Sequence, residues 1–391
     1  MKLTGIFVAA FIAAVMSSFA SAAPNEIRLG FISPQSRQGG NQGVDMLNAF
    51  RLGLEHTGNK LGGLPVKLFT GDDQAKPEVG VQLARQMMER DKIHIMSGLL
   101  YSHVSEAVLS TVLPTGRFVM AVSGGETSRA GKNCQPNYFL ASWIIASTFQ
   151  EVGAYLAKEG VKRVAVITNN YAAGWDVVSG VKRGYGKDLV AEVLVTLGQS
   201  DYGAEISRLR AANPEVIVEF LPGAPGAAFL LQLKQSGLRE AVKIYTQTTI
   251  ADVSTFKATG DAAIDLVHVG NWSENLDNAA NRKFVEAYRE QYGETPSILA
   301  AMAYDTVLLL NAAVTAVNGD VENSDAFREA LRNVKYDSIR GYFAFNNNHF
   351  PIQNYYLNRV SKTKSGELKN DLLATLTEAG MDQYHQDCPM K

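Results

Sequence analysis

The sequence is short of the residues from which most catalytic and metal sites are built. It has two cysteines and six histidines in 391 residues, and it contains neither a GxSxG nor an HExxH pattern nor a cluster of metal ligands. His94 and His103 lack the neighbours that a metal site requires, and His94, within an apolar strand, is typical of a packed core histidine. We therefore expect a protein that is not an enzyme, with no catalytic residue, metal or cofactor.

An excess of charge of one sign is also missing. Lysine and arginine together number 37 and aspartate and glutamate 39, so the formal net charge is −2 at pH 7. No basic patch and no run that mixes basic and aromatic residues is present, which argues against nucleic acid as a partner. The composition favours a small solute as the ligand.

Long apolar runs occur at two places. Residues 1–22, MKLTGIFVAAFIAAVMSSFASA, combine one positive charge, an apolar centre and a small-residue end, which is typical of a secretory signal peptide cleaved before Ala23. Residues 297–317 are apolar almost all round but include Asp305 and Asn311, so we predict a buried packing helix rather than a membrane span. The mature chain of about 370 residues is expected to be exported and to form two domains.

The two cysteines, Cys134 and Cys388, both lie in the mature chain and in loop-like sequence, GKNCQPN and QDCPMK. In an oxidising compartment an even pair predicts one disulfide, which here would tie the extreme C-terminus to the middle of the chain. Two free thiols, or half of a metal site, are the alternatives.

Strands, turns and helices alternate along the chain with short connections. Apolar strands are predicted at 27–33 and 64–70, and the stretch from Ile93 to Thr127 adds two more with a helix between them. A second series of the same kind starts at 138–142 and continues through the strands VKRVAVIT and PEVIVEF. Such alternation is the sign of doubly wound parallel sheets, so we predict an α/β fold with two similar Rossmann-like lobes.

Two turns in the stretch from Ile93 to Thr127 form the candidate site, because ligands bind at the carboxyl ends of the strands of an open parallel sheet. The first turn, with Tyr101 and Ser102, precedes a helix whose free N–H groups can hold a carboxylate or another anion. The second turn, Ser123 to Gly125, lets backbone amides approach a ligand closely. The alternatives are that Ser102 is only a helix cap and that Ser-Gly-Gly is only a tight turn.

Several tracts, spread in order over nearly the whole mature chain, match one known family. They are the opening IRLGFISPQS, the tract GDDQAKPEVGVQLARQMMERDKIHIMSG, the strand and turn RFVMAVSGG, the tract RLRAANPEVIVEFLPG with KQSGL after it, and the helix AMAYDTVLLL. The chain thereby resembles the periplasmic solute-binding proteins of ABC importers of the branched-chain amino acid (Leu/Ile/Val-binding) type. No single tract decides this, but the ordered set is highly specific.

The resemblance implies a type I periplasmic binding protein, in which two Rossmann-like lobes are joined by three crossover segments and close over the ligand. The crossings fall near Ser142, Trp272 and Asn347. The implied division is a signal peptide at 1–22, a first lobe at 23–142 and 273–346, and a second lobe at 143–272 and 347–391. The resemblance also implies a periplasmic monomer that delivers a small carboxylate-bearing ligand to the permease of an ABC importer in the inner membrane.

Site residues follow from the same resemblance. In this family the turn that matches Gly98 to His103 binds the ligand carboxylate through a serine hydroxyl and backbone amides, which places Ser102 there. The second lobe contributes an aromatic side chain from the turn NNYAAG, here Tyr171, and the turns LPGAPG and TQTT complete the wall. The predicted ligand-binding residues are Tyr101, Ser102, Ser123, Gly124, Gly125, Tyr171, Pro222, Gly223, Gln247 and Thr248.

One departure from the family bears on the ligand. Members that bind amino acids use an acidic side chain for the ligand ammonium in the turn that here holds Gln247, Thr248 and Thr249, all neutral. A buried ammonium without an anionic partner is poorly compensated. A carboxylate without an ammonium group is therefore favoured over a plain amino acid, and the resemblance to members of the family that take up aromatic acids implies such an acid as the ligand. Glu126 or Glu219 is the alternative source of the negative charge.

Three further alternatives stay open. Arg37, where many relatives have glycine, is a candidate contact for a ligand carboxylate, although a surface arginine is the commoner outcome. A dinucleotide-dependent or hydrolytic enzyme on the same kind of sheet would rest on PGAPGAA, but the spacing of Gly223 and Gly226 is not GxGxxG. A ligand-sensing subunit of a receptor would be expected to carry a transmembrane or signalling segment.

Overall fold

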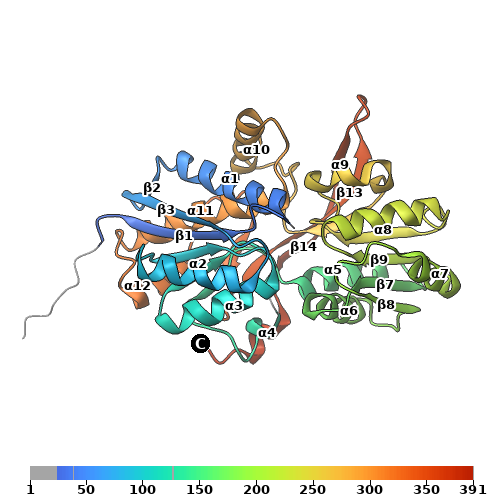
Figure 1. The fold of residues 1–391 in the computed structure, drawn as a ribbon, viewed down its shortest axis with the longest axis horizontal. Coiled ribbons are helices and arrows are strands. Elements are labelled where there is room, and N and C mark those ends of the chain that lie inside the picture. The colour runs from blue at the N-terminus through green and yellow to red at the C-terminus, as the bar shows by residue number, and fades with distance from the viewer. Residues whose placement is uncertain (1–23, 38, 126, 391) are drawn as a thin grey trace, which may run out of the picture.

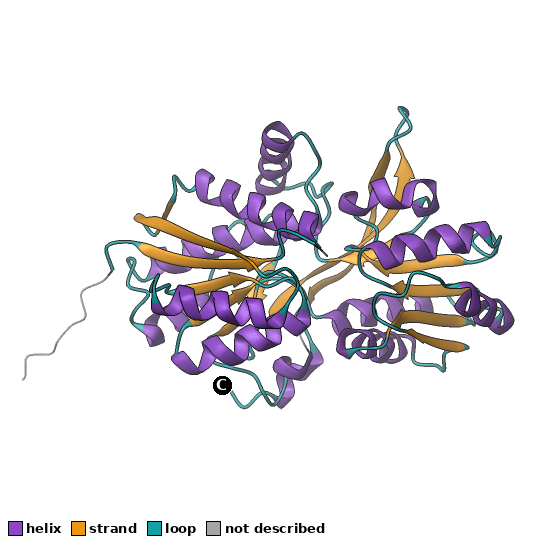
Figure 2. Ribbon diagram, viewed as in Figure 1, coloured by secondary structure: helices purple, strands orange, loops and turns teal. Residues whose placement is uncertain are grey.

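The protein has two lobes, each built around a mostly parallel β-sheet with helices on both faces (Figures 1 and 2). The computed structural model describes residues 24–37, 39–125 and 127–390. The predicted signal peptide and Glu126 lie outside these residues. The predicted α/β fold with two Rossmann-like lobes is confirmed, whereas the residue bounds that we assigned to each lobe stay a prediction.

The sheet of the first lobe has the strand order β2-β3-β1-β4-β5-β6, and its pairings are parallel except that between β2 and β3. Its strands are β1 (Ile27–Ser33), β2 (Lys60–Leu61), β3 (Leu64–Asp72), β4 (Ile95–Gly98), β5 (Phe118–Ala121) and β6 (Tyr138–Leu140). The central strands β1, β4 and β5 are buried almost throughout, as expected for parallel strands that are covered by helices on both faces.

Helices cover both faces of this first sheet. They are α1 (Gly40–His56), α2 (Pro77–Glu89), α3 (Ser102–Val112), α4 (Thr127–Ala130), α10 (Ala279–Tyr292), α11 (Ile298–Ala316) and α12 (Ser324–Arg332), with the 3-10 turn η1 (Leu113–Thr115). Among the described helices, α11 alone is long and apolar enough to cross a membrane, but 78% of its most apolar window is buried within the fold. Because Gly53 of α1 lets Val307 of α11 approach closely, the two helices pack along each other, and the predicted packing helix is confirmed.

The sheet of the second lobe has the order β12-β13-β11-β10-β9-β7-β8, with β14 paired to β13. Its strands are β7 (Val164–Asn169), β8 (Ala191–Val195), β9 (Val216–Phe220), β10 (Lys243–Gln247), β11 (Val267–Gly270), β12 (Phe343–Phe345), β13 (Pro351–Lys362) and β14 (Leu368–Gly380). Strands β7 to β11 are parallel, and β13 is antiparallel to β11, β12 and β14. The helices of this part are α5 (Ile145–Lys158), α6 (Ala172–Tyr185), α7 (Gly203–Ala212), α8 (Ala224–Gln235) and α9 (Val253–Thr259), with the 3-10 turns η2 (Gly260–Ala263) and η3 (Gln383–Asp387).

Two elements differ from the sequence-based expectation. Helix α1 begins at Gly40, inside the glycine-rich segment RQGGNQG, whose composition is typical of a turn rather than of a helix. A side chain at Gly43 would collide with the carbonyl oxygen of Pro34, so glycine allows the first turn of α1 to lie directly on the loop after β1. Strand β14 was not expected, because apolar and polar residues alternate poorly in its sequence, LKNDLLATLTEAG. Its pairing with β13 is visible only in the folded chain.

The chain crosses between the lobes after β6, returns after β11 and crosses again between α12 and β12. Side chains join these crossing segments to one another. The amide nitrogen of Asn271, which follows β11, donates to the carbonyl oxygen of Ser142 at 3.2 Å and to the side-chain oxygen of Gln353 in β13 at 2.9 Å. The segments therefore form one hydrogen-bonded hinge rather than independent linkers.

A buried ion pair anchors this hinge to the first lobe. Arg340 and Asp305 of α11 are both fully buried, and the guanidinium Nε lies 2.9 Å from Asp305 Oδ2. The carboxylate also accepts from the hydroxyls of Tyr336 and Ser338 and from the Ile339 N–H, at 2.7, 2.9 and 3.0 Å. These additional hydrogen bonds offset part of the desolvation cost of burying the carboxylate. From the other side of the guanidinium, Nη1 donates to the Gln353 side-chain oxygen at 3.0 Å.

The predicted disulfide between Cys134 and Cys388 is present, and it joins positions 254 residues apart. After β14 the chain returns to the first lobe, where η3 lies against α4. Asn348 supports this return, because its amide donates to the Ala130 carbonyl oxygen at 2.8 Å and to the carboxylate of Asp382. The C-terminal tail is therefore a covalently fastened fourth link between the lobes (Figure 1).

We predict that replacing both cysteines, Cys134→Ser with Cys388→Ser, lowers the free energy of unfolding by roughly 2–5 kcal/mol, because the unfolded chain regains the entropy of a long closed loop. Urea unfolding followed by circular dichroism measures this change. The wild type should lose a similar amount when a reductant is added, whereas the double serine variant should not respond. Equal midpoints for the wild type and the variant would contradict the prediction.

We also predict that Asp305→Asn lowers the free energy of unfolding by about 3–5 kcal/mol, because it leaves the Arg340 charge buried without a counter-ion. The double variant Asp305→Leu with Arg340→Met removes both charges and should recover part of the loss. The measurement is the urea midpoint of the wild type, the single variant and the double variant. A single variant as stable as the wild type would show that the ion pair does not support the hinge.

Candidate ligand-binding site

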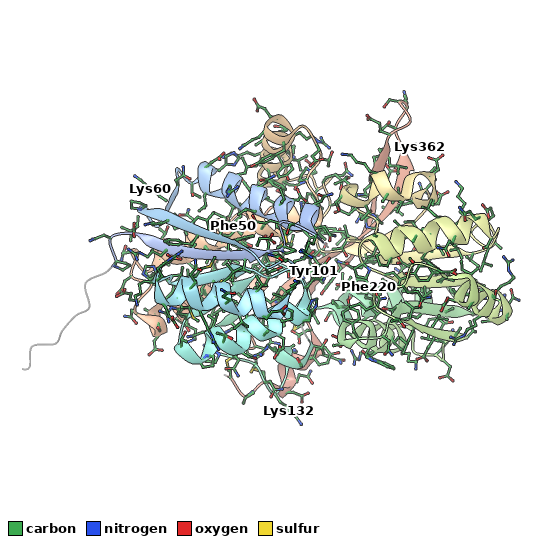
Figure 3. All side chains as sticks on the ribbon, in the orientation of Figure 1. Phe50, Lys60, Tyr101, Lys132, Phe220 and Lys362 are labelled. Atoms are coloured by element: carbon green, nitrogen blue, oxygen red, sulfur yellow. A yellow bond between two sulfur atoms is a disulfide. The ribbon has the colours of Figure 1, made fainter. Side chains whose placement is uncertain are left out.

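A cavity lies between the two lobes, at the carboxyl ends of the parallel strands of both sheets. The volume of this cavity is about 80 Å³. Its lining residues are Gln42, Leu100, Tyr101, Ser102, His103, Ser123, Gly124, Trp143, Ile145, Tyr171, Phe220, Pro222, Gln247, Thr249 and Leu299. Figure 3 shows Tyr101 of the first lobe and Phe220 of the second lobe on the facing sides of the two lobes. We call this space the interlobe cavity.

On the first-lobe side the interlobe cavity meets the start of α3. Gly98 has a φ of 93°, and a side chain there would collide with Ile32, so glycine ends β4 and turns the chain into the helix. Tyr101 is the extended N-cap residue, and its carbonyl oxygen accepts from the N–H groups of Val104 and Ser105 at 3.0 and 2.8 Å. The first amides of α3, including that of Ser102, have no partner within the helix and carry partial positive charge.

The turn after β5 supplies the second part of this wall. Ser123 is 6% exposed, and its carbonyl oxygen accepts a hydrogen bond from the hydroxyl of Ser142 in the hinge. A side chain at Gly124 would come within 3.0 Å of the Trp143 indole nitrogen, so glycine lets this large ring cover the turn. Gly125 instead faces Leu140 and donates its N–H to the Trp143 carbonyl oxygen at 2.8 Å, so it shapes the turn without lining the cavity.

Two tyrosines from opposite lobes come together at the interlobe cavity. Tyr171, the N-cap residue of α6, has a pKa raised above its usual value by burial and, secondarily, by its proximity to Tyr101. The Tyr101 ring lies 5.7 Å from the His103 ring, and His103 Nε2 is 3.0 Å from the Ala75 carbonyl oxygen. This network holds the Tyr101 ring beside the helix start, where both tyrosines offer flat apolar faces to a ligand.

The second-lobe wall comes from the ends of β9 and β10. Phe220 is 5% exposed and packs edge-on against Phe149 with the ring centroids 5.4 Å apart, and Pro222 follows it on the same loop. Gln247 and Thr249 line the cavity, whereas Thr248 points into the lobe and bonds His268 Nδ1 at 3.0 Å. Gly223 begins α8 with a φ of 78° and does not reach the cavity lining.

No aspartate, glutamate, lysine or arginine lines the interlobe cavity in the part of the chain that the structure describes. Glu219 is fully buried but accepts from the Leu221 N–H at 2.8 Å on its own loop, and burial raises its pKa to about 8. Because its neutral form dominates at pH 7 and it does not line the cavity, it is a poor source of charge for a ligand. Arg37 is exposed and also lies outside the lining.

A carboxylate of the second lobe reaches the first lobe beside the cavity. Asp252, 3% exposed, caps α9 through the Ser254 N–H at 2.9 Å and accepts from the Ile298 N–H at the start of α11 at 2.7 Å. Burial raises the pKa of Asp252 to about 7. Within the first lobe, Asp45 accepts from the hydroxyl of Ser297 at the same helix start. Asp252 therefore bridges the lobes at the positive end of a long helix.

Sequence reasoning missed some of the lining residues. Leu100 and His103 lie within the predicted turn from Gly98 to His103, and Phe220 stands directly before the predicted turn LPGAPG. Their place at the ends of parallel strands could have indicated them. Gln42, Trp143, Ile145 and Leu299 come from helices and from the hinge. Their side chains reach the cavity only because the two lobes face each other, and nothing local in the sequence indicates that.

A wider surface depression of about 870 Å³ lies at the opposite edge of the first sheet, where its strands begin. Several charged residues there bond their neighbours. Arg28 bonds Glu26 at 2.7 Å and Arg117 donates to the Ile93 carbonyl oxygen at 3.1 Å. His94 Nδ1 accepts from the Arg28 N–H at 3.1 Å, which agrees with a packed rather than a metal-binding histidine. The interlobe cavity is the better candidate, because both sheets direct their strand-end loops into it.

The comparisons of this chain with known proteins agree with one another. Residues 26–366 match the family described as periplasmic binding protein. Leu/Ile/Val-binding protein homolog 6 of Brucella abortus is 24% identical over 377 residues, which cover 94% of this chain and 96% of the relative. A solved solute binding protein of an ABC transporter from Rhodopseudomonas palustris BisB5, in complex with 3,4-dihydroxy benzoic acid, is 25% identical with a TM-score of 0.84 and covers 92% of this chain and 99% of its own.

A second solved solute binding protein, from R. palustris in complex with benzoate, has a TM-score of 0.84 at 24% identity and covers 92% of this chain and 98% of its own. The family match spans both sheets, and the family implies a ligand-binding role and an extracytoplasmic location and points away from an enzyme. The resemblance seen in the sequence is confirmed: the chain belongs to the periplasmic binding protein family and has its type I fold.

Proposed function

We propose that the protein captures one small carboxylate, an aromatic acid rather than an amino acid, in the interlobe cavity and delivers it to the permease of an ABC importer in the inner membrane. The observation that carries the proposal is the composition of the cavity. A helix start and hydroxyl groups stand on one side, aromatic and aliphatic faces surround the middle, and no charged side chain of the described residues stands on the other side.

We assign the carboxylate group of the ligand to the first lobe. The hydroxyls of Ser102 and Ser123 and the free amides at the start of α3 converge there, next to the Trp143 indole. Helix N-termini bind anions without a cationic side chain, because the backbone N–H groups and the helix dipole act together. This end therefore holds one negative charge and gives the ligand its orientation.

The body of the ligand is assigned to the aromatic part of the cavity. Tyr101, Tyr171, Phe220 and Trp143 present ring faces there, and Leu299 of α11 adds an aliphatic surface. Flat rings stack well on such faces. The solved relatives that carry benzoate and 3,4-dihydroxy benzoic acid support an aromatic acid as the ligand.

Amino acids are the second candidate ligand class, which the names of the Leu/Ile/Val-binding relatives favour. An ammonium group in this cavity would have no carboxylate partner among the described residues, because Glu219 bonds its own loop. Burial of an unpaired ammonium is strongly unfavourable. Glu126, outside the described residues, is the one candidate partner left from the sequence analysis.

Transport follows from closure of the lobes. The crossing segments allow a hinge motion about a packed axis, and Asp252 joins the closed faces through the Ile298 N–H. We infer that the chain works as a periplasmic monomer, exported by the signal peptide at 1–22, and that the permease recognises the closed, loaded form.

We predict that benzoate- and cinnamate-like acids raise the melting temperature, while leucine, isoleucine, valine and phenylalanine do not. The reason is mass action, because a ligand that binds only the folded state stabilises it. A thermal-shift screen followed by calorimetry provides the measurement, and succinate serves as a carboxylate control without a ring. A shift with the amino acids alone would contradict the aromatic-acid assignment.

We predict that Ser102→Ala weakens binding of the best acid by roughly 1–2 kcal/mol, the range for losing a hydrogen bond to a charged group. Isothermal titration calorimetry measures the affinity. Ser110→Ala, on the exposed face of the same helix, is the matched control and should bind like the wild type. Unchanged affinity of Ser102→Ala would remove this hydroxyl from the site.

We predict that Asp252→Asn weakens binding about 3- to 10-fold, because the closed state loses one charged hydrogen bond between the lobes. Asparagine keeps one oxygen for the cap of α9, so the second lobe should stay folded. Asp45→Asn is the control, since Asp45 bonds only within the first lobe in the described structure. Small-angle scattering should show a smaller ligand-induced compaction for Asp252→Asn than for Asp45→Asn, and equal compaction would refute the bridge.

A further inference from the structure

Gln247 ends β10 on the second-lobe wall of the interlobe cavity and is 2% exposed. Its side-chain oxygen accepts from the Thr249 N–H at 3.3 Å and from the Thr249 hydroxyl. A backbone N–H can only donate, so the oxygen of the amide and not its nitrogen must face Thr249. The orientation of the Gln247 amide is thereby decided by its neighbour.

The Gln247 amide nitrogen is left as a buried donor with no hydrogen-bond partner among the residues that the structure describes. Leaving a buried donor unpaired is unfavourable, and native structures rarely tolerate it without a reason. Phe220 and Pro222, which share the second-lobe wall, offer no side-chain acceptor, and neither does Leu299 of the first lobe. A ligand group in the cavity is therefore the natural acceptor for this N–H group.

Thr249 supplies a hydrogen-bond acceptor next to the Gln247 donor. Its hydroxyl gives its one proton to the Gln247 oxygen, so towards the cavity it can only accept. Together the two side chains offer one donor and one acceptor, both uncharged. A hydroxyl group, which accepts one hydrogen bond and donates another, satisfies both, whereas an ammonium cannot accept and a bare ring edge can do neither.

Resting on the proposed function, we propose that Gln247 and Thr249 form a specificity site for a hydroxyl group on the ligand, so that the preferred ligand is a hydroxy-substituted aromatic acid. The carboxylate is held by the first lobe and the hydroxyl by the second. Each end of one small molecule thus binds a different lobe, and the hydroxyl contact forms only when the lobes close. Gln247 acts as the specificity-determining donor and Thr249 as the acceptor.

The test compares acids that differ only by one hydroxyl group. The pairs are benzoate with 3-hydroxybenzoate, benzoate with 4-hydroxybenzoate, and 3-phenylpropionate with 3-(4-hydroxyphenyl)propionate. Calorimetry should show that the wild type prefers the hydroxylated member of at least one pair about 3- to 10-fold, the range for one or two neutral hydrogen bonds. Equal affinity within all pairs would overturn the specificity site and leave the proposed function intact, whereas binding of none of the acids would overturn both.

The variants Gln247→Met and Thr249→Val keep the volume of the side chains and remove the donor and the acceptor. Each should lower the affinity for the hydroxylated acid about 3- to 10-fold more than the affinity for its partner without the hydroxyl, so that the preference is lost. An equal loss for both members of the pair would assign a merely structural role to the residue and overturn the proposal. Melting temperatures without ligand identify any variant that fails to fold, and Gln247→Leu then replaces Gln247→Met in the same comparison.

Discussion

The buried charge of Arg340 is the constraint on which the arrangement of the lobes depends. A guanidinium without solvent must have a counter-ion and hydrogen-bond acceptors, and this one finds them in Asp305 of α11 and Gln353 of β13. The same Gln353 oxygen accepts from Asn271, which also bonds the Ser142 carbonyl oxygen. One ion pair therefore ties together the crossing segments and joins them to the longest helix of the first lobe. The lobes can rotate about this cluster but cannot separate from it.

At the proposed anion site of the interlobe cavity, backbone and helix dipoles stand in the place that arginine or lysine side chains take in other anion sites. With no arginine or lysine in the described lining, the proposed site for an acid consists of helix amides, hydroxyls and the Trp143 indole. The opposite wall is neutral as well, and Glu219 next to it is turned into its own loop and kept largely protonated by burial. The absence of charged side chains from the described lining is the basis of the proposed preference for an acid over an amino acid.

The C-terminal tail adds a restraint that the hinge alone does not supply. From the long hairpin of β13 and β14 in the second lobe the chain returns to α4 and is fastened there by the Cys134–Cys388 disulfide. Asp252 adds a hydrogen bond between the lobes at the positive end of α11. In the closing motion that we propose, the hinge would supply the axis and the tail a covalent restraint.

The sequence alone indicated the order of strands, turns and helices and the strand-end turns that hold Ser102 and Ser123, because these depend on local periodicity and on the direction of parallel strands. The ordered tracts of a known family indicated Tyr171 and Gln247, and the even number of cysteines predicted the disulfide. The sequence did not indicate β14, or the roles of Trp143 and Leu299, and it did not distinguish the lining residues from Gly125, Gly223 and Thr248 beside them. Only the tertiary structure decided those points. Which neighbour in a turn faces the cavity depends on the packing behind it, and which residues meet across the cavity depends on how the two lobes are hinged. Both are contacts between residues far apart in the chain, which local sequence does not encode.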